Sequence, residues 1–197
     1  MNKNVLICGI GGQGTVLASK LIAASAMRMG EIVHSAETIG MAQRGGSVTS
    51  HVRIGEAYSP LIPTGQTDIL VAFEPSEAVR NLSYVKDNGV VVVNDTPIKP
   101  TTESLQETGY DGKEMLEYLQ EKRQCVVVQG GKLCEKLGSS KFLNIAMLGV
   151  VAGTGRLEID TAVLETQITE SVPERFLETN LQAFREGIKI GEEYAAK

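Results

Sequence analysis

The sequence predicts an α/β fold built on a Rossmann-like, doubly wound and mostly parallel sheet. A glycine-rich loop at 9–15 joins a short apolar run to an Ala-rich helical segment, which is the order of a strand, a tight turn and a helix. Two further apolar runs, 69–73 and 90–93, are continuous rather than alternating, as is typical of parallel strands covered on both faces. Helical patterns fill much of the remaining sequence, which favours a layered α/β architecture. The expected strands are 5–8, 31–35, 47–54, 69–73, 90–94 and 125–129.

The first expected helix, 15–29, carries apolar residues around most of its circumference and ends at Gly30. A short crossover helix is expected at 76–85, after Glu74 and Pro75 break the chain.

The segment 47–54 does not fit the alternation of parallel strands and helices, because its residues alternate between apolar and polar. It is followed by Gly55 and by a second extended piece at 61–63, so we interpret the region as a hairpin at the sheet edge. The expected fold is therefore mostly parallel, with a hairpin on one edge.

The C-terminal region is expected to be largely helical. A helix is predicted at 141–151, capped at Ser139 or Ser140. An amphipathic final helix is predicted at 174–197. The polar stretch 96–112, which contains two prolines, is expected to be a loop.

Composition limits both the number of domains and the classes of partner. A chain of 197 residues with 42% hydrophobic residues fits a single domain spanning 1–197. A net charge of −5 argues against nucleic acid or an anionic membrane as the main partner. The sequence lacks an apolar run near the ~18 residues that span a bilayer, and its N-terminus lacks a leader pattern. We therefore expect a cytoplasmic protein without a membrane partner.

The three cysteines, Cys8, Cys125 and Cys134, lack CxxC spacing. Neither a disulfide framework nor a zinc or iron–sulfur site is therefore expected from this chain alone. Two of these three cysteines are expected in or near strands as small apolar side chains.

The glycine loop has the features of an anion-binding site. Gly11 and Gly12 would let a ligand approach bare backbone, and Gly14 would allow close contact between helix and strand. The start of the following helix offers unpaired N–H groups and a partial positive charge. Together with Gln13 and Thr15, these glycines form a candidate cofactor-binding loop.

Three interpretations of this loop remain open. A conventional NAD site needs an acidic residue about 20 positions onward, at the end of the second strand. That window holds Ile32, Val33 and His34, while Glu31 comes too early and Glu37 too late. A NAD site, a site for another phosphate or anion, and a purely structural turn are the alternatives.

A second candidate loop, 35–47, follows the second strand and is expected at the same carboxyl edge of the sheet. Arg44 has a forked donor for phosphate or carboxylate, and Gly45 and Gly46 leave backbone N–H groups accessible. In the simpler alternative, the glycines are only a hinge and Arg44 is a solvated surface charge. Asn94 ends a strand at the same edge and is a candidate ligand contact, although Asx residues also begin turns.

Four further residues are weaker candidates for a ligand or catalytic role, and each has a simpler structural explanation. His51 could be an ordinary polar strand residue, Glu74 a turn residue, and Lys141 and Asn144 helix-start residues. The two histidines lack an obvious nucleophile partner in the sequence, so no catalytic residue is assigned and no metal ligand is expected. The chain is poorly equipped to perform chemistry unaided.

Several of these segments together resemble a known family, the gamma-type subunits of 2-oxoacid:ferredoxin oxidoreductases. The resemblance covers nearly the whole chain and is strongest to the indolepyruvate branch, at its beta subunit. The stretch GMAQRGGSV at 40–48 is far more specific than the glycine loop. The matching segments are 9–15, 40–48, 50–53, 73–75 and 144–149.

The resemblance implies an oxidative decarboxylase that converts a 2-oxoacid to an acyl-CoA. Indolepyruvate or another aryl pyruvate is the expected substrate, and a branched-chain or other 2-oxoacid, pyruvate included, stays open. The resemblance also implies that ferredoxin accepts the electrons. Thiamine diphosphate and [4Fe-4S] clusters would belong to a large partner subunit in a hetero-oligomer, and this chain would contribute to the coenzyme A site and be inactive alone. Gly11, Gly12, Gln13, Gly14, Thr15 and Arg44 match positions of the family's glycine and ARGG-like motifs, and their individual roles are our inference.

Two rival hypotheses remain beside this one. The chain could be a free-standing nucleotide- or NAD(P)-binding protein, or a structural docking subunit with a vestigial loop. The segment 96–112 matches no family motif, so nothing is transferred to it. The choice of 2-oxoacid is expected to depend mainly on residues of the partner subunit.

Overall fold

A computed structural model describes residues 1–39, 45–98 and 109–196. Its core is a six-stranded sheet with the order β2-β3-β1-β4-β5-β6. Strands β1, β4, β5 and β6 are parallel neighbours, whereas β3 runs antiparallel to both β1 and β2. The mostly parallel α/β fold is confirmed. The strands are β1 Lys3–Ile10, β2 Val33–Ile39, β3 Ser47–Ile54, β4 Thr67–Ala72, β5 Val85–Asn94 and β6 Gln124–Val128.

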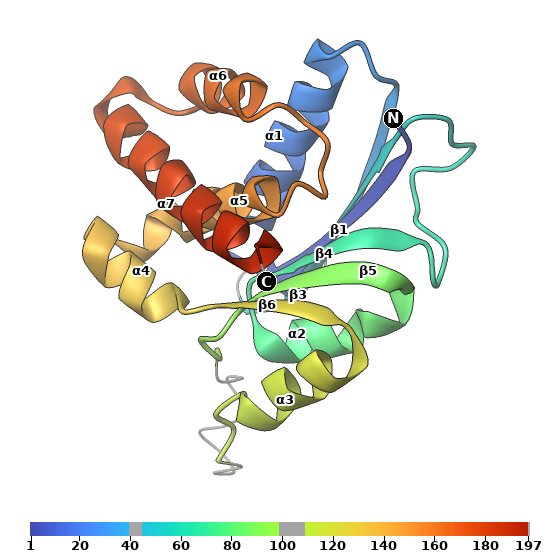
Figure 1. Ribbon diagram of the computed structural model, residues 1–197, viewed down its shortest axis with the longest axis vertical. Helices are drawn as coiled ribbons and strands as arrows, with labels where there is room; N and C mark the ends of the chain where they lie inside the picture. Colours follow the sequence, from blue (N-terminus) through green and yellow to red (C-terminus); the bar gives the residue numbers. More distant parts are fainter. Residues whose placement is uncertain (40–44, 99–108, 197) are drawn as a thin grey trace.

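Helices cover both faces of the sheet (Figure 1). α1, α4, α5, α6 and α7 lie on one face, and α2 and α3 lie on the other. The helices are α1 Thr15–Arg28, α2 Pro75–Arg80, α3 Lys113–Lys122, α4 Gly130–Leu137, α5 Leu143–Gly153, α6 Thr161–Ser171 and α7 Leu177–Ala195, with short 3-10 turns η1 Leu82–Tyr84, η3 Ser140–Phe142 and η4 Glu174–Phe176.

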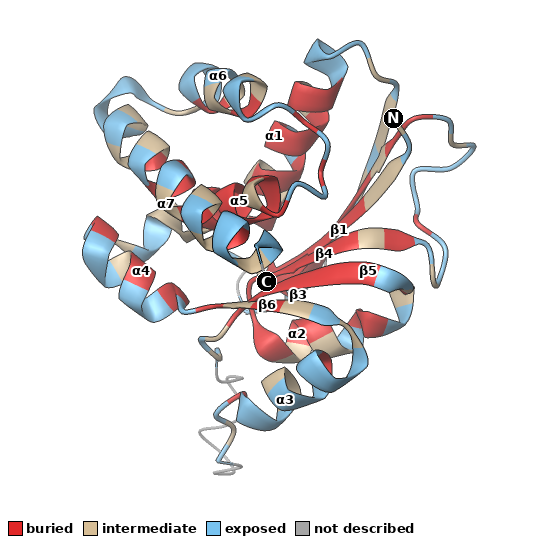
Figure 2. Ribbon diagram, in the orientation of Figure 1, coloured by how far each residue is buried: buried red, intermediate tan, exposed pale blue. Residues whose placement is uncertain are grey.

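The parallel strands are buried on both faces, which explains their continuous apolar runs. In β4, Ile69 and Val71 join the larger core under α1, α5 and α7, while Leu70 and Ala72 join the smaller core under α2 and α3. Figure 2 shows the strands of this central region as buried and the outer faces of α6 and α7 as exposed. Each strand therefore couples the two cores.

The antiparallel hairpin at the sheet edge is confirmed, but it pairs β3 with β2 and not, as predicted, with the piece at 61–63. β3 pairs with β2, from Val33 opposite Ile54 to Ile39 opposite Val48, so β3 is internal and β2 forms the edge. The piece at 61–63 is not a strand. It is irregular, and it contacts β3 through a side chain: Ile62 N donates a 3.1 Å hydrogen bond to His51 Nδ1.

The predicted helices are confirmed with shifted ends. α1 stops one residue before the predicted Met29, and Gly30 has a φ of 84° as expected after a helix end. The crossover helix breaks at Asn81 and continues as η1. The hydroxyl of Ser139 caps the next helical segment by accepting a 3.2 Å bond from Lys141 N.

Within the predicted loop at 96–112, the described residues 96–98 and 109–112 form neither helix nor strand. Residues 99–108 lie outside the described part of the chain.

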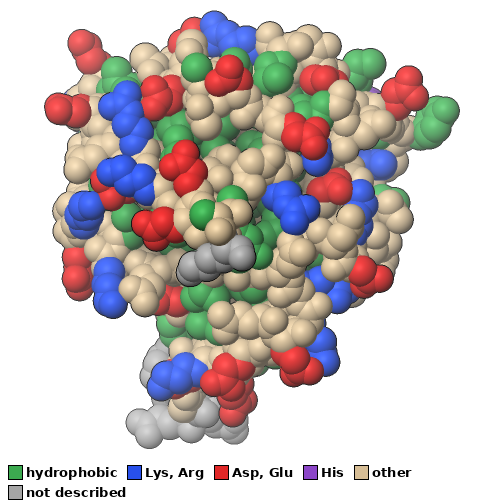
Figure 3. Space-filling view, in the orientation of Figure 1, with side chains coloured by type: hydrophobic (Ala, Val, Ile, Leu, Met, Phe, Trp, Pro, Cys, Tyr) green, Lys and Arg blue, Asp and Glu red, His purple; other side chains and the backbone are tan. Residues whose placement is uncertain are grey.

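Cys8 lies in β1 and Cys125 in β6, as expected for two of the three cysteines. On the face seen in Figure 3, acidic and basic side chains are interspersed rather than gathered by sign. None of the helices in the described ranges is both long and apolar enough to cross a membrane.

Candidate functional site

A cavity of about 450 Å³ lies where the parallel strands end, at the carboxyl edge of the sheet. Ligands of open α/β sheets bind at this edge. The cavity joins the glycine loop to segments far apart in the sequence. Its lining residues are Gly12, Gln13, Gly14, Asn94, Thr96, Ile98, Gly130, Gly131, Cys134, Ser140, Lys141, Leu143 and Asn144.

The glycine loop needs glycine at two positions. Gly12 and Gly14 have φ values of 104° and 86°, in the left-handed region that disfavours other side chains. A Cβ at position 14 would also lie 2.5 Å from Asn144 Nδ2, so only glycine lets α5 approach α1 here. The first turn of α1 has no side-chain cap from Gly14, and its N–H groups can therefore attract an anion.

The Gln13 side chain fixes the shape of this loop. Its Oε1 accepts a 2.6 Å hydrogen bond from Ile10 N, and its Nε2 donates a 2.9 Å bond to Phe73 O at the end of β4. The amide thereby ties the turn to the neighbouring strand. Gln13 holds the loop in place and also lines the cavity.

Asn94 has a similar structural role at the end of β5. Its side chain is 2% exposed, and Nδ2 donates a 3.0 Å bond to the same carbonyl, Phe73 O. Its Oδ1 is buried without a hydrogen-bond partner among the described residues and lies against Gly130, where a Cβ would overlap it. Asn94 thus connects β4, β5 and the start of α4 beneath the cavity.

The far wall of the cavity comes from α4 and the segment leading into α5. The Asp95 carboxylate accepts a 3.2 Å bond from Gly130 N, so a negative charge already occupies the start of α4. Lys141 is the charged residue among the described lining residues. Burial raises the pKa of the Cys134 thiol, which favours its neutral form.

Of the second predicted loop, 35–47, the first five residues belong to β2 instead, and its described glycines lie beside the glycine loop. Gly46 O accepts a 2.8 Å bond from Gly11 N, and Gly45 has a φ of 77°. Gly11, Thr15, Gly45 and Gly46 do not line the cavity, and Thr15 is buried. Arg44 lies outside the described residues. The ligand roles of all these residues stay predictions.

Glu74 forms a separate buried network next to the site. Its carboxylate has no exposed surface and accepts 2.5 Å bonds from Ser76 Oγ and Tyr110 OH, together with a 3.0 Å bond from Glu77 N. Glu74 therefore caps α2, which is the turn role that the sequence left open. Burial, followed by the bond to Glu74, raises the pKa of Tyr110 to about 12.

The histidine candidate has a structural role. His51 is buried in β3, where its Nδ1 accepts the bond from Ile62 N and burial lowers its pKa. The described residues contain no group of three or more His, Cys, Asp or Glu side chains placed to hold a metal ion.

Sequence reasoning named Lys141 and Asn144 as weaker candidates with a helix-start alternative, and it missed the rest of the far wall, including Gly130 and Gly131. One signal was present: two glycines directly follow the apolar strand β6, as the glycine loop follows β1. The proximity of Asn144 to Gly14 depends on long-range packing and has no local signature.

The fold and the site define a class: a Rossmann-like α/β domain with a glycine-loop cavity at the carboxyl edge of its sheet. Residues 4–190 match the model of the pyruvate ferredoxin/flavodoxin oxidoreductase family. The chain belongs to this family and is a gamma-type subunit of a 2-oxoacid:ferredoxin oxidoreductase complex.

Individual relatives cover nearly the whole chain. It is 36% identical over 191 residues to indolepyruvate oxidoreductase subunit IorB of Archaeoglobus fulgidus, covering 95% of this chain and 94% of that protein. The gamma subunit of a keto/oxoacid ferredoxin oxidoreductase from Geobacter sulfurreducens has the same fold, with a TM-score of 0.71, 23% identity and coverage of 97% and 99%.

A larger protein shares the fold as one part of its chain. The 2-oxoglutarate:ferredoxin oxidoreductase of Magnetococcus marinus, solved with 2-oxoglutarate, coenzyme A and succinyl-CoA, aligns with a TM-score of 0.75 and 19% identity. The alignment covers 98% of this chain and 31% of that one.

Proposed function

We propose that this chain forms part of the coenzyme A site of an indolepyruvate-type 2-oxoacid:ferredoxin oxidoreductase. The observation that carries the proposal is the cavity at the carboxyl edge, where the uncapped start of α1, bare glycine backbone and Lys141 meet. These groups favour a phosphate-bearing ligand. The aligned 2-oxoglutarate enzyme, solved with coenzyme A, gives this ligand a precedent in a protein of the same fold.

The lining also suits the other half of such a ligand. Ile98 and Leu143 add apolar surface beside the glycine loop, where an aliphatic pantetheine arm can pack. Coenzyme A supplies the thiol that receives the acyl group. The residues of this chain bind and orient it: the loop held by Gln13 receives the phosphates, and the apolar wall guides the arm.

The remaining chemistry belongs to a large partner subunit in this proposal. That subunit holds thiamine diphosphate and the [4Fe-4S] clusters, selects the aryl pyruvate and passes electrons to ferredoxin. The similarity to an indolepyruvate oxidoreductase subunit over nearly the whole chain supports this substrate class. The chain would dock the large subunit in a hetero-oligomer.

The sheet order disfavours the NAD alternative. In a dinucleotide-binding fold, the second strand lies next to the first and presents its terminal acid to the ribose. Here the antiparallel β3 separates β2 from β1. The end of β2 is therefore one strand further from the glycine loop than that fingerprint requires.

The test uses the complex reconstituted with its large subunit. Gly12→Asp places a carboxylate where phosphate is proposed to bind, and we expect the KM for coenzyme A to rise by about 10-fold or more. Gly65→Asp is the matched control, because Gly65 also has a positive φ and open space around it, yet lies outside the cavity. Arg44→Ala tests the second loop in the same assay.

Alkylation of Cys134 gives a readout independent of activity. Cys134 lines the cavity, so coenzyme A should slow its modification by N-ethylmaleimide, measured by peptide mass mapping. Unchanged coenzyme A kinetics in Gly12→Asp, together with no protection of Cys134, would show that the loop is vestigial. Protection by micromolar NAD(P) or ATP instead would favour a nucleotide-binding protein.

A further inference from the structure

A second, smaller cavity of about 170 Å³ adjoins the main one. Both cavities are lined by Lys141 and Asn144, so the two spaces meet at these residues. The smaller cavity lies between the start of α1, η3 and the segment that leads into α7. The other residues of its lining are Leu17, Phe142, Val172, Pro173, Phe176 and Asn180.

The two cavities differ in chemistry. Apolar surface predominates in both, but the main cavity presents glycine backbone, whereas the smaller one presents two phenylalanine rings. Phe142 and Phe176 meet edge to face with ring centroids 6.3 Å apart, and the Arg175 guanidinium lies 4.7 Å from the Phe176 ring centroid. Phe176 remains 38% exposed, so part of its ring is available to a flat aromatic ligand.

Lys141 is placed between these two environments. It is the charged residue in the described lining of either cavity, and its side chain is exposed. Within the described ranges, no carboxylate lies within 4 Å of its ammonium group. Its backbone is held by the bond from its N–H to Ser139 Oγ, so the ammonium projects from a fixed point.

We propose that Lys141 binds the 3′-phosphate of coenzyme A and that the Phe142–Phe176 cavity receives its adenine ring. This inference rests on the proposed function and deepens it. In coenzyme A the adenine, the phosphorylated ribose and the diphosphate follow one another. In this chain the smaller cavity, Lys141 and the glycine loop follow one another in the same order. Lys141 is thereby a specificity residue that distinguishes coenzyme A from its 3′-dephospho form.

The experiment compares coenzyme A with 3′-dephospho-coenzyme A as acyl acceptors in the reconstituted complex. Lys141→Met should raise the KM for coenzyme A by about 10- to 100-fold, as expected for loss of an ionic hydrogen bond. The KM for the dephospho form should change by less than about 3-fold, because that form lacks the group that Lys141 contacts. Lys141→Arg should restore most of the discrimination.

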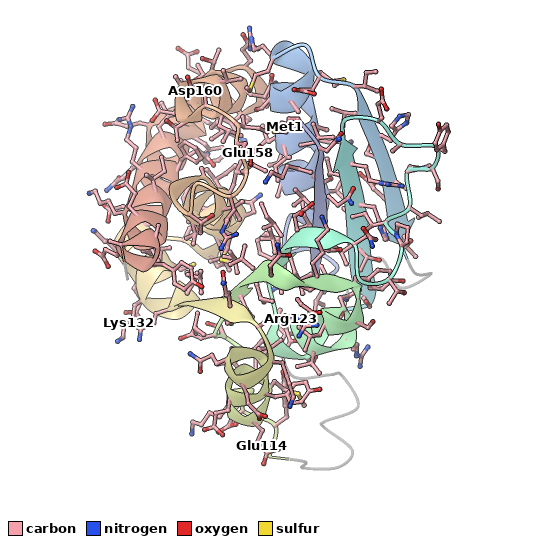
Figure 4. All side chains as sticks on the ribbon, turned by 45° about the vertical axis from the view of Figure 1, so that its right-hand side comes forward. Met1, Glu114, Arg123, Lys132, Glu158 and Asp160 are labelled. Atoms are coloured by element: carbon pink, nitrogen blue, oxygen red, sulfur yellow. The ribbon has the colours of Figure 1, made fainter. Side chains whose placement is uncertain are left out.

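Lys132→Met is the matched control. Lys132 lies in the first turn of α4, near the same end of the sheet, but it projects outward (Figure 4) and lines neither cavity. Its ammonium donates a 2.9 Å bond to Gln129 Oε1. This variant should leave the ratio of the two KM values unchanged, which separates direct contact from a general effect of charge.

Phe176→Ala tests the adenine contact separately. It should raise both KM values by the same factor and leave their ratio as in the wild type. Inhibition by adenosine 3′,5′-bisphosphate should weaken in both Phe176→Ala and Lys141→Met, whereas inhibition by AMP should weaken only in Phe176→Ala.

Several outcomes would overturn the inference. An equal rise of both KM values in Lys141→Met would exclude a contact with the 3′-phosphate. Loss of complex assembly in Phe176→Ala, seen by size-exclusion chromatography, would assign the aromatic residues to subunit docking. If Lys141→Met has no effect while Gly12→Asp still weakens coenzyme A, this inference fails and the proposed function stands. If neither variant has an effect, both fail.

Discussion

At the scale of single residues, Glu74 shows how a buried charge is accommodated beside the site. A carboxylate without exposed surface is costly unless donors satisfy it, and here two hydroxyls and two backbone N–H groups do so. Tyr110 OH donates to Glu74 Oε1, and Ile98 N donates to the same atom over 3.4 Å, so this one oxygen links described residues on either side of 99–108. Since Ile98 lines the cavity, Glu74 supports the cavity wall indirectly.

The raised pKa of Tyr110 gives a prediction about stability at alkaline pH. The folded pKa is about 12, against about 10 in an unfolded chain. Between these values the unfolded chain loses a proton that the folded chain keeps, so the free energy of unfolding should fall as pH rises from about 10 to 12. The stabilisation is fully present below pH 10.

Urea denaturation of the wild type and of Tyr110→Phe, repeated from pH 9 to 12, measures this effect. The stability advantage of the wild type should shrink over that interval, because the variant lacks the ionising hydroxyl. Tyr58→Phe is the control, since Tyr58 is fully exposed. Parallel curves for the wild type and Tyr110→Phe would show that Tyr110 ionises alike in both states.

The same scale shows what a sequence can reveal about a site. Gly12 and Gly14 were predictable, because a glycine turn between strand and helix has a local signature. The hydrogen bond by which the Gln13 side chain links the loop to the end of β4 could not be predicted, since its partner Phe73 O is sixty residues away in sequence. Asn94 was predicted as a ligand contact from its place at a strand end, and its bond to the same carbonyl depends on the neighbouring strand.

At the scale of elements, the contact between α5 and α7 depends on glycine. A Cβ on Gly149 would overlap the carbonyl oxygen of Phe184, and one on Gly187 would overlap that of Ala146. The two backbones are therefore in direct contact, without side chains between them. Gly153 and Gly191 repeat the arrangement one turn further along. This packing fixes α5, whose N-terminal end supplies Asn144 and follows Lys141.

Gly149→Ala should therefore destabilise the chain by about 2–3 kcal/mol, because the helices must move apart. Gly131→Ala is the control, since its Cβ would meet only Thr96 Oγ1 at 3.7 Å. In that variant the higher helix propensity of alanine should be neutral or stabilise by up to about 1 kcal/mol. Chemical denaturation measures both. Equal effects of the two substitutions would show that the α5–α7 contact relaxes without cost.

The elements themselves differed in how far they could be predicted. Apolar runs identified β4 and β5, because burial on both faces leaves a mark in the sequence itself. The pairing of β3 was misassigned because its alternating apolar and polar residues predict a strand but do not indicate which strand it pairs with. The partner was β2, the strand that precedes the family motif at 40–48 in the sequence. The α5–α7 contact involves two segments about 35 residues apart, and neither one alone reveals it.

At the scale of the whole molecule, the two faces of the sheet are covered unequally. The larger core gathers α1, α4, α5, α6 and α7, and α5 is buried along most of its length. On the other face, α3 contributes Leu119 as its fully buried side chain. The proposed coenzyme A site lies beside α1 and α5, on the thickly covered side. Because the elements around this site are well packed before the ligand binds, little binding free energy is spent on ordering them.

This asymmetry predicts a gradient of local stability. Opening α3 exposes little apolar surface, so its amides should exchange through local unfolding, whereas those of α5 should need nearly global unfolding. Hydrogen exchange followed by mass spectrometry should show peptides from α3 exchanging about 100-fold faster or more than peptides from α5. Gly149→Ala should narrow this difference by loosening α5. Equal protection of α3 and α5 in the wild type would mean that the sheet transmits stability evenly to both layers, and that the site gains no rigidity from lying on the thicker side.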